Sequence, residues 1–243
     1  MSSKWLSHER YPLVLLGLLL ALTAALAIAP YDRSDWMLEN ALLVVGLAVL
    51  IATRGVLPLS RFSYTLIFVF LCLHSVGAHY TYARVPYDVW VEALTGRTLS
   101  AALGWERNHF DRLVHFCYGL LLAYPVREVF LCFAAVRGFW GYYLPLDVTM
   151  ATSMLYELIE WGAAEFFGGD LGVAYLGTQG DVWDAQKDMA FASLGGVLAM
   201  GITCALHWRY QRDFAREWAE SLRVKRARPL GEDELARMMK QGG

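Results

Sequence analysis

The sequence has few charged residues and no grouped cysteines. Only 18% of its 243 residues are Asp, Glu, Lys or Arg, and the formal net charge is -2, so nothing indicates a basic surface for nucleic acid. The four cysteines stand singly and form no CxxC pair, which gives no support to a disulfide framework or a structural zinc site. Internal repeats and low-complexity segments are also missing. These absences argue against a nucleic-acid-binding protein, a disulfide-rich or zinc-stabilised domain and a repeat protein, and the chain is dominated by apolar residues.

Hydrophobic residues make up 57% of the chain, and they gather in runs that approach the ~20 residues needed to cross a bilayer. The runs are spread along the chain, so we predict one all-α, polytopic membrane helix bundle in a bacterial inner membrane. The expected spans are about 11–29, 37–52, 62–82, 108–127, 142–163 and 182–208.

Three local features of the spans shape this prediction. The run from Tyr11 to Ala29 is long for a signal peptide and is followed by further spans, so we expect an uncleaved first transmembrane helix. Pro125 is expected to kink or end the fourth span near Arg127. The apolar stretch from Val129 to Val136 is too short to cross alone; it either extends that helix, lies at the interface or re-enters the membrane.

Basic residues in the short loops predict the orientation. The N-terminus, the loop 53–61, the turn 127–137 and the start of the tail have the clearest excess of lysine and arginine, whereas the loops 30–36 and 164–184 are acidic or neutral. The positive-inside rule then places both termini in the cytoplasm. The tail, 209–243, is expected to contain an amphipathic helix on the cytoplasmic surface, because Phe214, Trp218 and Leu222 recur at spacing four among charges.

With this topology, polar residues from four spans reach the outer half of the membrane. The third and fifth spans end there, and the fourth and sixth begin there. Asp111 and His115 are one turn apart, as are Asp184 and Asp188, so each pair shares a helix face. Ionisable groups at this depth are costly unless they have partners.

A divalent metal ion would partner these groups, because carboxylates and histidines at i, i+3 and i, i+4 spacing are the way helix bundles build metal sites. The donor set suits zinc, manganese, iron or magnesium. The candidate ligands are His79, Asp111, His115, Glu157, Glu160, Asp181, Asp184 and Asp188. Among these, Glu157, Asp184 and His115 are the candidates for catalysis, as base or as ligands of a metal that activates water.

The depth of these polar residues in the membrane predicts what the protein binds. A site under the outer leaflet would meet membrane lipids or a lipid-linked small-molecule substrate, so a metal-dependent hydrolase or transferase acting on a lipid or cell-envelope precursor is the leading functional prediction.

Two other readings stay open. Acidic and histidine side chains in a bundle also mark pathways for protons or cations, although the inner halves of the spans offer few groups besides Arg127 and Glu128. Alternatively the protein is structural, with His74 and His115 as interhelical hydrogen-bonding groups and the acids as interfacial charges; Asp181 would then cap the last span.

Several strings resemble a known family. HSVGAHYTYARVP, NHFDRLVHFCYGLLLAYPVREV, YELIEW and YLGTQGDVWDAQKDM together are similar to the YjdF-type family of bacterial inner-membrane proteins, over roughly Phe62 to Gly196. More distantly, DRLVHF, a glutamate late in the next helix and aspartates opening a helix with a later Gly-Gly resemble VanZ-like membrane proteins, which are associated with glycopeptide resistance. The first resemblance implies the fold and the location but supplies no reaction.

Overall fold

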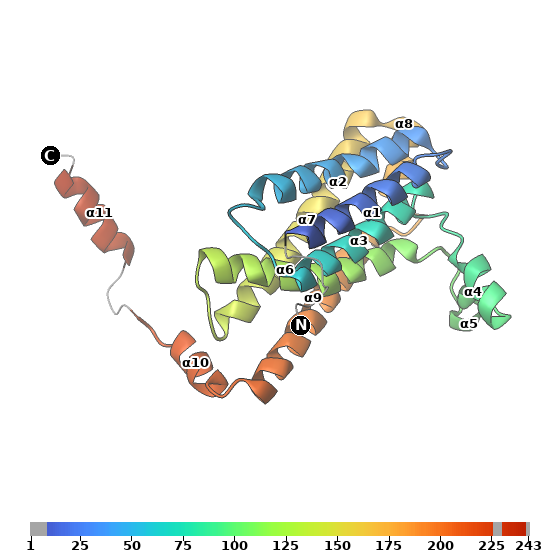
Figure 1. Cartoon of the computed structure of the whole chain (residues 1–243). Helices are drawn as coiled ribbons and strands as arrows, with labels where there is room; N and C mark the ends of the chain where they lie inside the picture. Colours follow the sequence, from blue (N-terminus) through green and yellow to red (C-terminus); the bar gives the residue numbers. More distant parts are fainter. Residues whose placement is uncertain (1–8, 226–229, 242–243) are drawn as a thin grey trace.

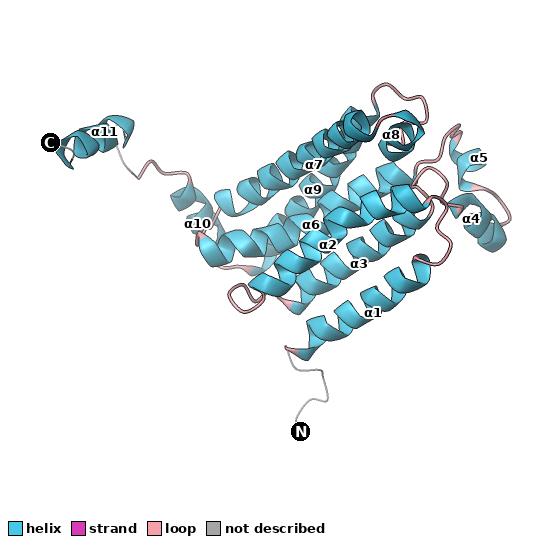
Figure 2. Cartoon of the chain, turned by 90° about the horizontal axis from the view of Figure 1, so that it is seen from above, coloured by secondary structure: helices cyan, strands magenta, loops and turns pink. Residues whose placement is uncertain are grey.

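The computed structural model describes residues 9–225 and 230–241, and within them every regular element is a helix. Six long helices form the bundle, shown in Figure 1 and from above in Figure 2. They are α1 (Arg10–Leu26), α2 (Arg33–Thr53), α3 (Arg61–His79), α6 (Phe110–Phe133), α7 (Trp140–Phe167) and α9 (Asp184–Tyr210).

The long helices coincide with the six predicted spans. By length and apolar composition, α2, α3, α6 and α9 can each cross a membrane, and α1 is a shorter apolar helix of 17 residues. The 28 residues of α7 run beside α6 and α9, as Figure 2 shows. The predicted class, an all-α polytopic membrane bundle, is therefore confirmed.

The structure has one of the alternatives left open for the fourth span. The stretch that starts at Val129 extends the helix, because α6 continues through Pro125 to Phe133. Pro125 is buried inside the bundle. Membrane helices tolerate an internal proline because neighbouring helices and local adjustments satisfy the freed backbone groups.

Short helices complete the chain. Two of them, α4 (Tyr87–Thr95) and α5 (Leu99–Leu103), lie in the connector before α6, and α8 (Gly169–Leu176) joins α7 to the loop that precedes α9. In the tail, α10 (Phe214–Ser221) packs beneath α9, while α11 (Leu230–Gln241) stands apart from the bundle in Figure 1. Residues 226–229 of the predicted tail lie outside the described part of the chain.

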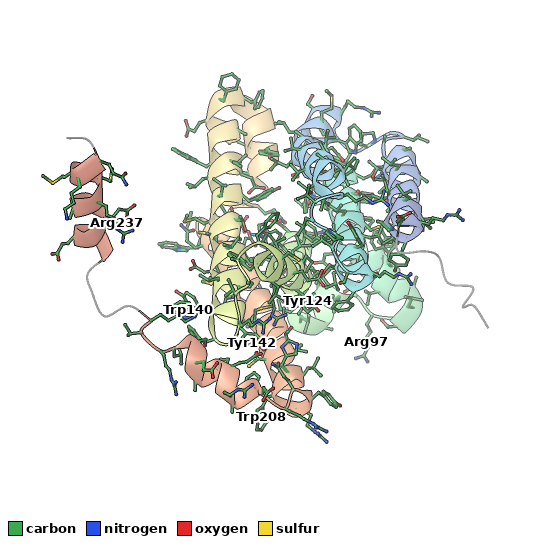
Figure 3. The ribbon with its side chains drawn as sticks, turned by 60° about the vertical axis from the view of Figure 1, so that its left-hand side comes forward. Arg97, Tyr124, Trp140, Tyr142, Trp208 and Arg237 are labelled. Carbon is green, nitrogen blue, oxygen red and sulfur yellow. The ribbon has the colours of Figure 1, made fainter. Side chains whose placement is uncertain are left out.

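At the end of the bundle where α7 begins, α10 is held by aromatic side chains. Trp218 packs on Phe139 and Tyr142, and the indole N–H of Trp140 donates to the Ser221 carbonyl oxygen at 2.8 Å. Figure 3 shows Trp140 and Tyr142 at this end of α7, close to α10. The amphipathic helix predicted in the tail is thus present and docks on α7 and α9 through its apolar side.

The tightest helix pair is α6 with α9, and glycines permit the close approach. A Cβ added at Gly119 would overlap the Ala192 carbonyl oxygen, and one at Gly195 would overlap the Phe116 carbonyl oxygen. Small residues at such interfaces let helix backbones approach closely in membranes. The contact fixes the register of α6 against α9 and so places their first turns side by side.

Candidate functional site

The candidate site lies where α6 and α9 begin. Asp111 and His115 come from the first turns of α6, Asp188 from the second turn of α9, and Glu157 faces them from α7. Their helical spacing turns each pair on one helix to the same face, as the sequence predicted. His115, Glu157 and Asp188 are at most 9% exposed, so the groups meet inside the bundle and not at its surface.

Donor atoms of this cluster are spaced as metal ligands are. One ligand atom from each of Asp111, His115 and Asp188 lies within 4.8 Å of the other two. His115 Nε2 is 3.5 Å from Asp111 Oδ1 and 3.5 Å from Glu157 Oε1. Two ligands bound at ~2.1 Å from a tetrahedral zinc ion are about 3.4 Å apart, so small side-chain movements would bring the cluster around one ion.

Two carboxylate oxygens of the cluster lack any hydrogen-bond partner. Glu157 Oε1 and Asp188 Oδ1 are buried, and neither accepts a hydrogen bond, although His115 Nε2 lies 3.5 Å from the Glu157 oxygen. An unpaired buried carboxylate is strongly disfavoured, and natural proteins pair such groups or use them to coordinate metals. We will call Asp111, His115, Glu157 and Asp188 the acid–histidine cluster.

Next to the acid–histidine cluster, two arginines bind the other predicted aspartates. Arg107 Nη1 donates to Asp184 Oδ1 at 2.5 Å, and Arg112 Nη2 donates to Asp181 Oδ2 at 2.5 Å. Lys187 Nζ also donates to Asp181, at 2.6 Å. The hydrogen bond from Lys187, followed by those from the Trp183 amide and Arg112, lowers the pKa of Asp181 to about 2.

These pairs separate the predicted ligands into two groups. Asp181 and Asp184 form ion pairs with arginine side chains, whereas among the described residues the ion pairs of Asp111 and Glu157 are with His115 and Asp188 forms none. Asp181 Oδ1 also accepts the amide of Trp183, a contact just before α9 that resembles the predicted capping role.

The other two predicted ligands lie elsewhere. The Nδ1–H of His79 donates to the Leu26 carbonyl oxygen at 2.7 Å, and the ring packs edge-on against Tyr80, so His79 ties α3 to the end of α1. Glu160 is half-buried on α7, almost one turn beyond Glu157, and is not among the three residues whose donor atoms converge.

Sequence reasoning missed a second buried polar group beside the cluster, on α2. Asp35 is 1% exposed and Glu39 is 5% exposed, and neither Asp35 oxygen has a hydrogen-bond partner. Tyr156 donates to Glu39 Oε2 at 3.3 Å from α7. The signal was present in the sequence, because Asp35 and Glu39 are one turn apart at the start of an apolar helix.

His74 hydrogen-bonds between helices, and Arg107 has a role that the sequence did not assign to it. His74 donates from Nε2 to the Glu39 carbonyl oxygen at 3.2 Å and accepts from the Tyr82 hydroxyl at Nδ1, at 2.5 Å. Both ring nitrogens are therefore used, as in the predicted interhelical hydrogen-bonding role. Arg107 lies before α6, in a connector with no periodic pattern that would point it at Asp184.

Fold and site together define a multi-pass helical membrane protein with a buried acid–histidine cluster at one end of its bundle. The chain belongs to the family described as "Predicted membrane protein (DUF2238)", whose model matches residues 11–209. It is similar to "Inner membrane protein YjdF" of Escherichia coli (strain K12), with 37% identity over 207 residues that cover 84% of this chain and 95% of the relative. The resemblance to the YjdF-type family is thereby confirmed. No solved structure matches the chain.

Proposed function

We propose that this protein is an inner-membrane, divalent-metal-dependent hydrolase or transferase that acts on a lipid or cell-envelope precursor at the outer leaflet. The observation that carries the proposal is the acid–histidine cluster, in which three donor atoms converge and two buried carboxylate oxygens have no partner. The location is supported by the Escherichia coli relative, which is an inner membrane protein by name.

Charge supports a cation at this place. The described basic residues near the cluster are already engaged, because Arg107 binds Asp184, and Arg112 and Lys187 bind Asp181. Three carboxylates and one imidazole are left together in a setting of low polarity. Like charges at such short range repel strongly, and a divalent cation would offset them.

Each residue of the cluster has a distinct part in the proposed reaction. Asp111, His115 and Asp188 would hold the metal ion, which supplies Lewis-acid polarisation and a lowered pKa for bound water. Glu157 faces His115 from the opposite helix with a free oxygen, so it is placed to accept a proton from the attacking water or hydroxyl. Asp184, paired with Arg107, positions the start of α9 and does not face the reacting atoms.

The outward orientation rests on the distribution of basic residues. Arg54 and Arg61 flank the loop between α2 and α3, and Arg137 lies between α6 and α7, all at the end of the bundle opposite the cluster. The positive-inside rule puts that end in the cytoplasm and the cluster under the outer leaflet. A buried site at that depth is reached more easily by a lipid than by a soluble metabolite.

Metal analysis of the purified protein tests the proposal. We expect protein purified in detergent and supplied with Mn²⁺ or Zn²⁺ to retain stoichiometric metal after desalting, and Asp188→Asn to lose most of it. Asp181→Asn is the matched control, since it removes an aspartate that lies before α9 and is bound by Arg112 and Lys187. Equal and negligible metal in all three proteins would refute the proposal. Retained metal without turnover of lipid extracts would favour the alternative, a cation-binding or transport protein.

A further inference from the structure

A cavity of about 160 Å³ leads from the acid–histidine cluster toward the middle of the bundle. An engineered apolar cavity of about 150 Å³ is large enough to stay dry and bind benzene, so this one admits a segment of hydrocarbon. Its wall is formed by Leu42, Leu43, Phe70, Leu71, His74, Tyr82, Asp111, Val114, His115, Tyr118, Ser153 and Tyr156.

The cavity is polar at one end and apolar at the other. On α6 the lining passes from Asp111 and His115 to Tyr118, about 10 Å further along the helix. On α3 it passes from His74, near the end of the helix, to Phe70, about 6 Å deeper. Both helices therefore place polar groups near the end of the bundle and apolar groups near its centre.

The cavity separates α2 from α7, and each of these helices packs mainly on helices other than the other one. Leu42 and Leu43 line it from α2, and Ser153 and Tyr156 line it from α7. However, α2 packs chiefly on α3 and α8, while α7 packs chiefly on α6, α8 and α9. Leu42, which lines the cavity from α2, is 36% exposed, so the cavity reaches the lateral surface of the bundle at this residue.

We propose that this cavity holds a segment of one acyl chain of a phospholipid, which enters laterally beside Leu42 of α2 and brings the ester and phosphate groups to the acid–histidine cluster. The inference deepens the proposed function and rests on it for the site of reaction. The occupant follows from the match of polarity, because a phospholipid is polar near the membrane surface and apolar toward the middle, as the cavity is. Phospholipid is also the component that surrounds a lateral opening at the highest concentration.

The binding can be measured without metal. The protein is placed in vesicles of phosphatidylethanolamine and phosphatidylglycerol that contain a phosphatidylglycerol with a diazirine in the terminal half of one acyl chain. After irradiation in EDTA, cross-linked residues are mapped by peptide mass spectrometry. We expect labels on the cavity residues Leu43 and Tyr118, besides labels on outward-facing residues that touch bulk lipid.

Filling the cavity provides the decisive comparison. Ser153 is 2% exposed and its hydroxyl has no partner, so Ser153→Leu puts apolar volume into the cavity without breaking a hydrogen bond. Each methylene group that leaves an apolar site changes affinity about fourfold, so exclusion of two should reduce labelling of Leu43 and Tyr118 about fifteenfold. Ala151→Leu is the matched control: it adds the same side chain to an exposed position of α7 and should leave these labels unchanged.

The outcomes separate this inference from the proposed function. Labels confined to outward-facing residues in the wild type would overturn the cavity inference whatever the metal content. Labels on Leu43 and Tyr118 that Ser153→Leu does not reduce would overturn it as well, as would cavity labelling by a diazirine polyprenyl phosphate but not by phosphatidylglycerol. If Ser153→Leu does not fold, Leu43→Phe narrows the same cavity, and Tyr118 remains as the reporter. Cavity labels in a protein that never binds metal would leave the lipid site standing and refute only the metal-dependent reaction.

Discussion

Substitution of Gly119 by alanine should weaken both the bundle and the metal site. A Cβ at Gly119 would lie 2.6 Å from the Gly196 amide nitrogen and would overlap the Ala192 carbonyl oxygen more closely still. Ordinary contact begins at 3.4 Å, so α6 and α9 must separate by at least about 0.8 Å. Backbone atoms form the obstacle, so no flexible side chain can relieve the overlap.

The change in the free energy of unfolding caused by Gly119→Ala has two opposing contributions. Overpacking of a close interface costs about 1–3 kcal/mol, and alanine recovers up to about 1 kcal/mol through its higher helix propensity. We therefore expect Gly119→Ala to lower the free energy of unfolding by about 1–2 kcal/mol. Gly201→Ala, also in a long helix but with nothing within 4 Å of the added Cβ, is the matched control and should be neutral or slightly stabilising.

The separation of α6 from α9 in Gly119→Ala should also change the geometry of the acid–histidine cluster. Asp111 lies two turns before Gly119 on α6, and Asp188 lies about two turns before Gly196 on α9. Metal sites tolerate distance errors of only about 0.2 Å, so a separation of 0.8 Å should reduce metal retention. Unfolding in detergent by SDS titration, together with metal content after desalting, measures both effects. If Gly119→Ala matches Gly201→Ala in stability and metal content, the claim that the glycine contact sets the geometry of the site is refuted.

Two further predictions concern the arginine pairs and the orientation. Arg107→Gln removes the short ion pair with Asp184, between side chains that are 13% and 5% exposed, and should lower the unfolding free energy in detergent by about 1.5–3 kcal/mol. The control Arg97→Gln, at an exposed position before α5, should change this free energy by less than about 0.5 kcal/mol. Equal effects of the two variants would contradict the role of the ion pair. With the native cysteines replaced by alanine, a membrane-impermeant maleimide added to intact cells should label Val182→Cys, which is 85% exposed beside the cluster, but not Gly55→Cys in the loop at the opposite end; the reverse pattern would invert the proposed topology.

The positions of the bundle helices could be predicted from the sequence because hydropathy is a local property. Each long apolar run became a helix, but the sequence left open whether the fourth span ends near Arg127 or continues, and α6 passes Pro125 and reaches Phe133. A proline ends helices reliably in water, where the freed backbone groups are solvated. In a bundle the neighbouring helices decide the outcome, and a single sequence contains no direct signal of them.

Helical spacing determines one part of the candidate site, and contacts between segments far apart in the sequence determine the rest. The i, i+4 spacing predicted that Asp111 and His115 share a face, and the topology brought Asp188 to them. Arg107 ends a connector of two short helices without long periodicity, so its ion pair with Asp184, 77 residues later, could not be read from either segment alone. As a result, Asp184 was predicted to bind a metal although an arginine already partners it.

The ion pairs of Arg107 and Arg112 support a bound cation at the acid–histidine cluster. The sequence suggested an excess of acids, but a count of charges cannot say which acids are neutralised. In the structure, Arg107 and Arg112 form their ion pairs with Asp181 and Asp184, and two oxygens of the acid–histidine cluster have no hydrogen-bond partner. Among the described residues, lysine and arginine side chains thus pair directly with the aspartates that do not converge, and none forms an ion pair with the carboxylates that do. A fold that needed its acids only for internal ion pairs would distribute its arginines in the opposite way, because a buried carboxylate without a partner opposes folding.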